Sequence, residues 1–206
     1  MSLTKAEKTK WESNLYIYNA ALEVLKTKIK LVKIEYDMLA VKNNYSEIQM
    51  ITDRIKSLES IIGKLEKNNL EFTVQNINDR IHDVVGCRIV CLTLDDVNAI
   101  VDLLRRTINR TEGFKIDKEK DYINNPKENG YQSYHFRVSV PVTFSDEKYN
   151  VPCEIQVRTL LIHAWAELHH LCYKENAVGP VKSQFAALAS NIEATDQLVI
   201  LTKNKR

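Results

Sequence analysis

The sequence lacks the features that mark membrane, secreted or fibrous proteins. No apolar run approaches the roughly 18 residues that a transmembrane helix needs, and no hydrophobic leader segment opens the chain. Only 5 glycines and 4 prolines occur, which excludes a collagen-like or low-complexity architecture. A large excess of charge of one sign is also missing: 29 basic and 27 acidic residues give a net charge of +2. We therefore expect no membrane partner and no DNA partner held by bulk electrostatics.

Cysteine is sparse as well, and its spacing excludes the common zinc motifs. Cys87, Cys91, Cys153 and Cys172 form no Cys-x-x-Cys pair and no cluster with histidine. Three of them lie in apolar runs, where a free thiol behaves as a small hydrophobe. This pattern predicts a reduced, cytoplasmic protein. With 44% hydrophobic and 27% charged residues, the 206-residue chain is expected to form one globular domain over residues 1–206.

Apolar residues recur every three or four positions from Leu15 to Leu39 and predict a long amphipathic helix. Its apolar face could pack on the core of the same chain or, coiled-coil fashion, on a partner helix. A second apolar stripe runs from Phe185 to Val199. Two stripes of this size could exceed what one subunit buries, so we expect a homo-oligomer. The alternative is that the two terminal helices pair inside one monomer.

The middle of the chain has the shorter period of strands. The apolar run Val84–Leu92 predicts a central strand covered on both faces, and Asp95 is the expected N-cap of the helix that follows. Further strands are expected at Phe114–Ile116, Ser133–Val142 and Asn150–Arg158, and further helices at Leu160–Tyr173 and about Val181–Thr202. The expected fold class is α+β, with a mixed sheet of about five strands flanked by helices.

Two positions pose geometric problems for this reading. Arg54 would interrupt an apolar helical stripe, so we expect a short strand that ends at Ser57, with Ser57 capping the next helix beside Lys56. Asp83 and Arg88 are five residues apart, so a flat strand would put them on opposite faces. A bulge or a twist at Gly86 could reconcile them.

Alternation gives the two late strands one polar face each. Ser133, His135 and Arg137 share a face of the first strand, and Glu154, Gln156 and Arg158 share a face of the second. Each face could simply meet water. If the loop at residues 143–149 joins neighbouring strands, however, the two faces merge into one surface. That surface would hold cations for phosphates, a carboxylate for a metal or a proton, and a nearby tyrosine for a base.

Four blocks together carry a resemblance to a known family. They read Arg54-x-Lys56-Ser57-x-x-Ser60-Ile61-x-x-Lys64-Leu65, Asp83-x-x-Gly86-x-Arg88, Asp121-Tyr122-Ile123-x-x-Pro126-Lys127-x-Asn129-Gly130-Tyr131-x-Ser133-x-His135 and Glu154-Ile155-Gln156-x-Arg158-Thr159. In this order they resemble the RelA/SpoT-type alarmone synthetases, over about residues 50 to 174. The resemblance implies a nucleotidyltransferase-like fold and transfer of pyrophosphate from ATP to the ribose 3′ hydroxyl of GDP or GTP. The products would be (p)ppGpp and AMP.

The resemblance also implies roles for individual residues. Asp83 and Glu154 would be catalytic and would bind Mg²⁺, with Glu154 also activating the 3′ hydroxyl. The residues implied to bind ATP are Arg54, Lys56, Ser57, Lys64 and Arg88. The residues implied to bind the acceptor nucleotide are Lys127, Asn129, Tyr131, His135, Gln156 and Arg158, with Tyr131 stacking on the base.

The chain is similar to the small, synthetase-only branch, because it leaves no room for the hydrolase domain and regulatory region of long members. We expect an N-terminal helical region at 1–48, a catalytic core at 49–174 and a C-terminal helix at 175–206. The segment Lys118-Glu119-Lys120 leaves the choice between GDP and GTP open, and Gln132 stands where small members commonly have arginine. Two alternatives are a toxin-like relative acting on an adenine nucleotide or the tRNA 3′ end, and a non-catalytic nucleotide-binding module.

Overall fold

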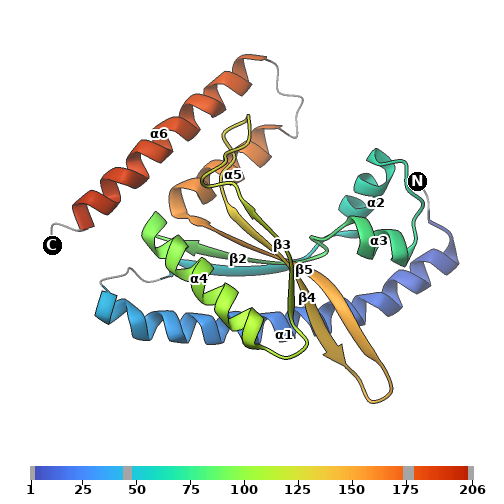
Figure 1. The fold of residues 1–206 in the computed structure, drawn as a ribbon. Helices are drawn as coiled ribbons and strands as arrows, with labels where there is room; N and C mark the ends of the chain where they lie inside the picture. The colour runs from blue at the N-terminus through green and yellow to red at the C-terminus, as the bar shows by residue number, and fades with distance from the viewer. Residues whose placement is uncertain (1–2, 44–47, 174–178, 204–206) are drawn as a thin grey trace.

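A five-stranded mixed sheet organises the molecule in the computed structural model, which describes residues 3–43, 48–173 and 179–203. The spatial strand order is β1-β2-β5-β4-β3, and only β2 and β5 run parallel (Figure 1). The strands are β1 (Met50–Ile55), β2 (Val85–Cys91), β3 (Lys115–Asp121), β4 (Tyr134–Thr143) and β5 (Lys148–Thr159). The helices are α1 (Lys5–Asn43), α2 (Leu58–Lys67), α3 (Val74–Arg80), α4 (Leu94–Arg110), α5 (Leu160–Tyr173) and α6 (Gly179–Lys203). The predicted fold class is confirmed.

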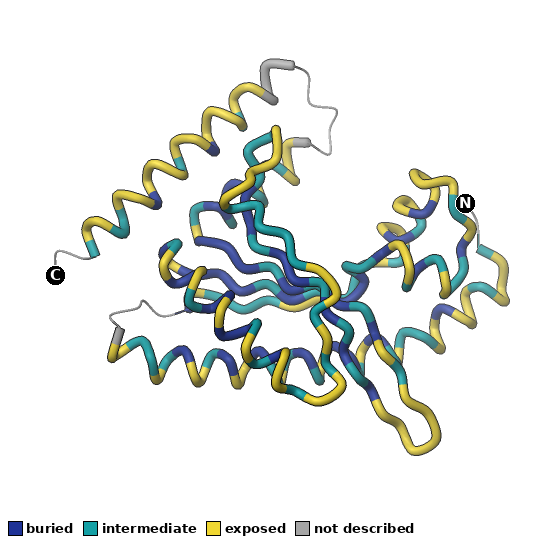
Figure 2. Tube along the Cα trace, in the orientation of Figure 1, coloured by how far each residue is buried: buried dark blue, intermediate teal, exposed yellow. Residues whose placement is uncertain are grey.

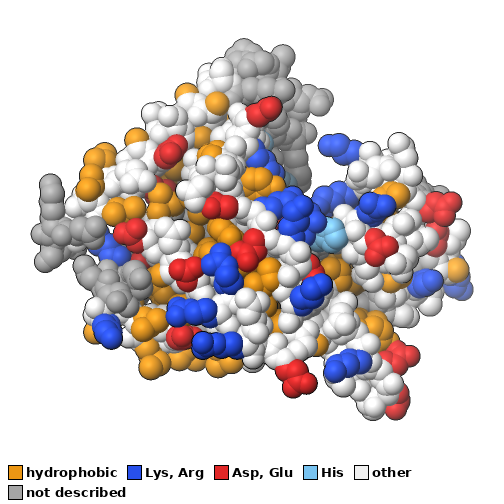
Figure 3. All heavy atoms as spheres, in the orientation of Figure 1, with side chains coloured by type: hydrophobic (Ala, Val, Ile, Leu, Met, Phe, Trp, Pro, Cys, Tyr) orange, Lys and Arg blue, Asp and Glu red, His pale blue; other side chains and the backbone are white. Residues whose placement is uncertain are grey.

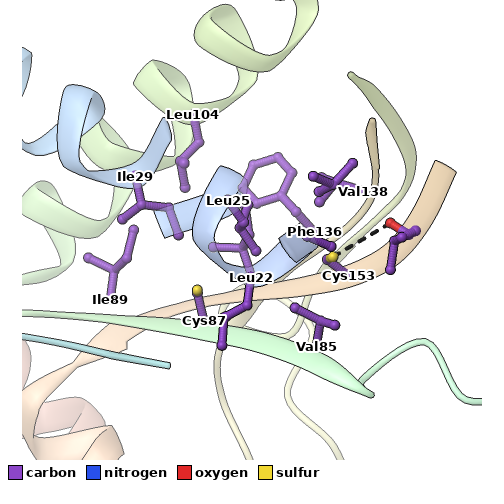
Figure 4. Close-up of a cluster of buried hydrophobic side chains, with 14 of the residues drawn as sticks. Leu22, Leu25, Ile29, Val85, Cys87, Ile89, Leu104, Phe136, Val138 and Cys153 are labelled. Atoms are coloured by element: carbon purple, nitrogen blue, oxygen red, sulfur yellow. Dashed lines mark hydrogen bonds between the residues drawn. The ribbon is translucent and has the colours of Figure 1, made fainter. Parts of the chain in front are cut away.

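The core lies between one face of the sheet and the helices α1 and α4 (Figure 1). The apolar stripe of α1 supplies Leu22, Leu25 and Ile29, which meet Cys87 of β2 and Phe136 of β4 (Figure 4). The long N-terminal helix is therefore confirmed, and its stripe faces the core of its own chain. Cys87, Cys91 and Cys153 are buried free thiols, as expected of small apolar residues, whereas Cys172 is exposed.

The start of α4 differs from the prediction by two residues. Thr93, not Asp95, is the N-cap, and it forms a capping box with Asp96. The hydroxyl of Tyr36 donates to Oδ1 of Asp96 at 2.8 Å, and Nζ of Lys203 lies 3.2 Å from the same oxygen. The spacing of Thr93 and Asp96 is that of a capping box, which explains why the cap falls on the threonine. The contacts of Asp96 tie α1, α4 and α6 together.

The conflict between Asp83 and Arg88 is resolved without a bulge. Asp83 lies in the turn before β2, which begins at Val85, so the two residues do not belong to one flat strand. The registers of β2 with β1 and with β5 both run without a shift, so of the two possibilities at Gly86, a bulge or a twist, the bulge does not occur. The face of β2 that carries Gly86 and Arg88 is only partly buried, so the expectation of a strand covered on both faces is also wrong.

Helices α5 and α6 lie on the other side of the sheet (Figure 1). Most of α6 is exposed, with isolated buried positions where it meets its neighbours (Figure 2). It is held by Trp165 of α5, whose Nε1 donates to the Phe185 carbonyl at 2.9 Å, and by the buried bond from Thr159 to Asp196 at 2.8 Å. Thus α6 packs on α5 and α4, while α1 packs on the sheet, so the two terminal helices do not form the alternative internal pair. Within the described ranges, no helix is long and apolar enough to cross a bilayer.

Candidate active site

The polar face of the sheet is continuous across three strands. In the register, His135 of β4 lies opposite Gln156 of β5, and Gln156 in turn lies opposite Arg88 of β2. Glu154 of β5 lies between Arg137 and Gly86 in the same way. The prediction that β4 and β5 are neighbours is confirmed, and His135, Arg137, Glu154 and Gln156 share one face opposite the α1 and α4 face, whereas Ser133 and Arg158 are almost completely buried.

A cavity of about 260 Å³ opens on this face beside β1 and β2. Its lining residues are Thr52, Asp53, Arg54, Asp83, Gly86, Cys87, Arg88, Glu154, Gln156 and Glu167. Arg54 is exposed at its edge, and Gly86 forms part of its floor. A Cβ added at Gly86 would come no closer than 4.0 Å to another atom, the Glu154 carbonyl oxygen. The glycine is therefore not needed by the backbone, and its effect is to leave space above the strand.

Asp83 lies between two lysines at one end of the cavity. Nζ of Lys56 donates to Oδ2 at 2.9 Å, and Nζ of Lys64 donates to Oδ1 at 2.8 Å. Burial acts to raise the pKa of Asp83, but the hydrogen bonds and charges of the lysines outweigh it and lower the pKa to about 2. Ser57 caps α2 as predicted, accepting from the Ser60 N–H at 3.3 Å. A carboxylate, two ammonium groups and a helix N-terminus thus meet, and Figure 3 shows Lys and Arg side chains gathered near the α2 and α3 segment.

Glu154 is the centre of a hydrogen-bonded chain that leads to Tyr131. Nε2 of Gln156 donates to Oε2 of Glu154 at 2.7 Å, and Nδ1 of His135 lies 3.3 Å from Oε1. Burial acts to raise the pKa of Glu154, but the hydrogen bonds and the charge of His135 lower it overall. Because a carboxylate only accepts, Nδ1 of His135 is the donor to Glu154, and Nε2 of the same ring lies 2.8 Å from the Tyr131 hydroxyl.

The loop before β4 presents aromatic rings and a lysine. Tyr131 meets Tyr122 edge-on, with ring centroids 6.0 Å apart. Nζ of Lys127 lies 4.8 Å from the Tyr131 centroid and 4.7 Å from the Tyr122 centroid. The N–H of Tyr131 donates to Oδ1 of Asn129 at 3.2 Å, which fixes the turn. The loop therefore offers a cation and ring edges within one small area.

Gly130 fixes the position of this loop against α6. Its φ is +84°, a conformation that favours glycine, and an added Cβ would lie 2.4 Å from the Cβ of Ala189. The buried Ala189 and the missing side chain at Gly130 let the helix and the loop approach closely. Any larger residue at either position would have to move the loop that carries Tyr131.

Arg158 departs from the sequence-based interpretation. It was expected on an open face with Glu154, yet it is only 1% exposed. Its Nη2 donates to Nδ1 of His163 at 2.8 Å and to Oε1 of Glu167 at 3.3 Å, while its Nε has no hydrogen-bond partner among the described residues. The end of β5 is covered by the start of α5, which the alternation pattern could not reveal.

Glu167 is a cavity residue that sequence reasoning missed. It lies on α5 and accepts from Nη1 of Arg88 at 2.9 Å, across 79 positions of the chain. The spacing of His163 and Glu167, one helical turn apart and just after Arg158, was the available signal for Glu167.

Tyr122 is a second residue that sequence reasoning missed. Its ring centroid lies 5.2 Å from that of His135, and it belongs to a motif in which it was given no role.

Comparisons with known proteins identify the family of the chain. The family described as "Region found in RelA / SpoT proteins" matches residues 53–178. GTP pyrophosphokinase YwaC of Bacillus subtilis is 36% identical over 79% of this chain and 74% of its own length. GTP pyrophosphokinase YjbM of the same organism is 34% identical over 84% of this chain and 77% of its own.

Solved structures support the same assignment. The small alarmone synthetase 2 of Bacillus subtilis has a TM-score of 0.80 at 30% identity, covering 95% of this chain and 99% of that one. The small alarmone synthetase 1 of the same organism, bound to its product pppGpp, has a TM-score of 0.79 at 26% identity, covering 96% and 98%. The chain therefore belongs to the RelA/SpoT family, among its small synthetases.

Proposed function

We propose that the chain transfers the pyrophosphoryl group of ATP to the ribose 3′ hydroxyl of GDP or GTP. A bond forms between the 3′ oxygen and the β-phosphorus, and the bond from the β-phosphorus to the oxygen bridging the α-phosphate breaks. The products are (p)ppGpp and AMP, and the hydroxyl proton leaves to a base. The observation that carries the proposal is the position of Glu154, between a basic cavity and an aromatic loop on one continuous face.

The cavity suits ATP. Lys56 and Lys64 converge on Asp83, and Lys56 directly precedes the Ser57 cap of α2, so we propose this place for the phosphate chain. Arg54 and Arg88 lie on the same side of β1 and β2, because Arg54 pairs with Gly86 and Thr52 pairs with Arg88. Gly86 lies opposite Arg54 and two residues from Arg88, and we propose that adenine occupies the space left by its missing side chain and stacks on the guanidinium planes. We assign Arg54, Lys56, Ser57, Lys64 and Arg88 to the donor nucleotide.

The carboxylates that line the cavity suit Mg²⁺. Asp83 and Glu154 supply hard oxygen donors, and the low pKa of both keeps them ionised at neutral pH. No group of three or more acidic, histidine or cysteine ligands occurs in the described parts of the chain. Two carboxylates without a third protein ligand fit an ion that takes its other ligands from phosphates and water, as Mg²⁺ commonly does. When bound, Mg²⁺ would neutralise charge on the transferred phosphates.

The aromatic loop suits the acceptor. Tyr131 presents a ring for a purine, and Lys127 is close enough to contact a phosphate or a base oxygen. Asn129 and His135 hold the tyrosine from both ends, and Gln156 fixes Glu154 from the other side. We assign these residues to acceptor binding, whereas Arg158 serves the acceptor only through its neighbours because it is buried.

Glu154 is the proposed base. It is ionised, and it lies where the acceptor side meets the donor cavity. His135 and Gln156 hold its two oxygens, so the carboxylate is oriented before substrates arrive. The remaining catalytic effect comes from aligning the 3′ oxygen with the β-phosphorus.

One incubation tests the proposal. The protein is mixed with Mg²⁺, ATP labelled at the γ-phosphate, and in parallel GDP, GTP, an adenine nucleotide or tRNA, and the products are separated by thin-layer chromatography. We expect label in ppGpp or pppGpp, with one AMP formed per product. Label on the adenine nucleotide or the tRNA would favour the toxin-like alternative, and ATP binding with no transfer would favour a binding module.

We also propose that residues 1–206 work as one synthetase domain and that copies associate into a tetramer. The expected divisions at residues 48/49 and 174/175 separate helical ends from the catalytic core, although residue 174 lies outside the described part. Leu198 and Leu201 on α6 and Val41 on α1 are large, exposed apolar residues that an interface would cover. Light scattering should give a mass near four times 23.8 kDa, and a mass near 23.8 kDa would contradict association.

A further inference from the structure

Glu167 links two arginines at the edge of the donor cavity. Its Oε1 lies 2.9 Å from Nη1 of Arg88 and 3.3 Å from Nη2 of Arg158, so a single oxygen serves both guanidinium groups. The same oxygen lies 3.6 Å from Nδ1 of His163, which already accepts from Arg158. These residues come from β2, β5 and α5, so the link joins the sheet to the helix above it.

The need for a carboxylate here is electrostatic. Arg158 is almost completely buried, and burial and the charge of Arg88 lower its pKa to about 10, while Glu167 acts in the opposite direction. The two guanidinium groups contact the same oxygen and therefore lie close together, and their repulsion is offset when an anion lies between them. Glu167 is that anion, and its carboxylate belongs to a side chain that is 57% exposed at the cavity.

Two contacts fix the orientation of the Arg88 guanidinium. Nη1 is held by Glu167, and Nε lies 3.5 Å from Oε1 of Gln156, so both contacts lie along the edge of the planar group. Edge contacts leave the two faces of a guanidinium free, and a face is what stacks on an aromatic base. The Arg88–Glu167 pair, with a half-exposed carboxylate, adds little to folding stability, so we attribute the Arg88 contact to orientation and the Arg158 contact to charge balance.

We propose that Glu167 is a positioning residue for the donor nucleotide, which holds the Arg88 guanidinium edge-on so that its face is presented to the adenine of ATP. This inference rests on the proposed function, because it takes the cavity beside Gly86 as the ATP site. It assigns to Glu167 no contact with the acceptor and no part in proton transfer. Its effect therefore belongs to donor affinity alone.

The test separates donor affinity from turnover. For Glu167→Gln we expect the KM of ATP to rise about tenfold, the size of one lost charge-assisted hydrogen bond. The kcat at saturating ATP and the KM of the guanine nucleotide should stay within about twofold of wild type. Glu167→Asp keeps the charge on a shorter side chain and should recover part of the loss. Glu193→Gln, a change at an exposed glutamate on α6, is the matched control and should alter nothing.

A double variant shows whether Glu167 acts through Arg88. In Arg88→Ala, the further change Glu167→Gln should leave the affinity for a non-hydrolysable ATP analogue unchanged, because no guanidinium remains to orient. An unchanged ATP KM in the single variant, an equal rise in both KM values, or an additive loss in the double variant would each overturn the proposal. Binding of the analogue needs no acceptor, so failure of this inference is distinguishable from failure of pyrophosphate transfer, which the product assay reports.

Discussion

The donor and acceptor halves of the polar face are organised by different forces. In the donor half, opposite charges hold one another: Lys56 and Lys64 bind Asp83, and Arg88 binds Glu167. In the acceptor half, Tyr131 is fixed by ring contacts and by its bond to His135. The donor half must exchange the Lys56 and Lys64 contacts of Asp83 for phosphates and metal while Arg88 keeps its contact with Glu167, whereas the acceptor half is shaped before its ligand arrives. Donor binding should therefore respond to charge, and acceptor binding to ring area.

The largest effect is expected where the two halves meet. Glu154→Gln keeps the shape of the side chain but removes the charge that accepts a proton and binds the metal, so transfer should fall by roughly 10²–10⁴-fold. Binding of a non-hydrolysable ATP analogue should stay within several-fold of wild type. Rapid-quench measurement of AMP release provides the rate, with Glu193→Gln as control. Wild-type turnover by Glu154→Gln would remove this residue from the mechanism.

A side chain at Gly86 should weaken ATP binding without changing any charged group of the donor half. The backbone has room for a Cβ, since the nearest atom would be 4.0 Å away, so Gly86→Val should fold normally. The valine methyl groups would nevertheless occupy the space proposed for adenine, and we expect ATP affinity to fall by about 100-fold, as for loss of two good contacts.

Gly63→Ala is the matched glycine control, because an added Cβ there meets nothing within 4 Å. Isothermal titration with the ATP analogue measures the affinity of each variant, and a thermal melt measures its folding stability. Normal ATP affinity in Gly86→Val would show that the adenine does not lie above this strand.

The sequence predicted the elements and the polar face well, because both depend on local pattern. Alternation placed Glu154 and Gln156 on one face, and the Arg54 argument predicted a strand and the Ser57 cap, although β1 ends at Ile55 and not at Ser57. One failure was local, because Thr93-x-x-Asp96 is itself a capping-box pattern, and Thr93 rather than Asp95 caps α4. The other failures are non-local: no pattern near Asp96, for example, shows that Tyr36, 60 residues away, donates to it.

The missed part of the site has the same origin. A glutamate on α5 looks like part of a solvated helix face, and only the packing of α5 over β2 brings Glu167 to Arg88. Arg158 was misjudged for the complementary reason. Its place in the alternation was right, but α5 covers the last residues of β5, and no periodicity within a strand predicts what lies on top of it.

A change at Tyr131 can show whether the ring or the hydroxyl matters in the acceptor half. Tyr131→Phe keeps the ring and loses the bond to His135, so we expect the KM of the guanine nucleotide to change less than about threefold. The kcat should fall modestly, because His135 then holds Glu154 without support from Tyr131. Steady-state kinetics measures both values. A loss of acceptor affinity above tenfold would show that the hydroxyl, not the ring, is the binding element.

The smallest effect concerns stability rather than chemistry. Burial raises the pKa of Asp196, which is 1% exposed, from 3.8 to about 6, although the Thr159 hydroxyl opposes the shift. An acid with a raised pKa favours the folded state fully below about pH 4, and that contribution is lost as the pH rises through 6.

Asp196→Asn should therefore raise Tm at pH 7 by roughly 3–6 °C and flatten the dependence of Tm on pH between 4 and 7. Asp146→Asn, a change in the exposed β4–β5 turn, is the control. Melting curves recorded between pH 4 and 7 measure how the Tm of each protein depends on pH. Parallel curves for wild type and Asp196→Asn would show that this carboxyl is not the titrating group.

The most direct test of the two-half account is a pair of KM values measured in two variants. Arg88→Ala should raise the KM of ATP at least tenfold and leave that of GDP or GTP within about twofold. Tyr131→Ala should do the reverse, raising the acceptor KM by the roughly 1–3 kcal/mol that base–aromatic stacking contributes. If either variant raised both KM values equally, the two nucleotides would not occupy separate halves of this face, and the account would be wrong.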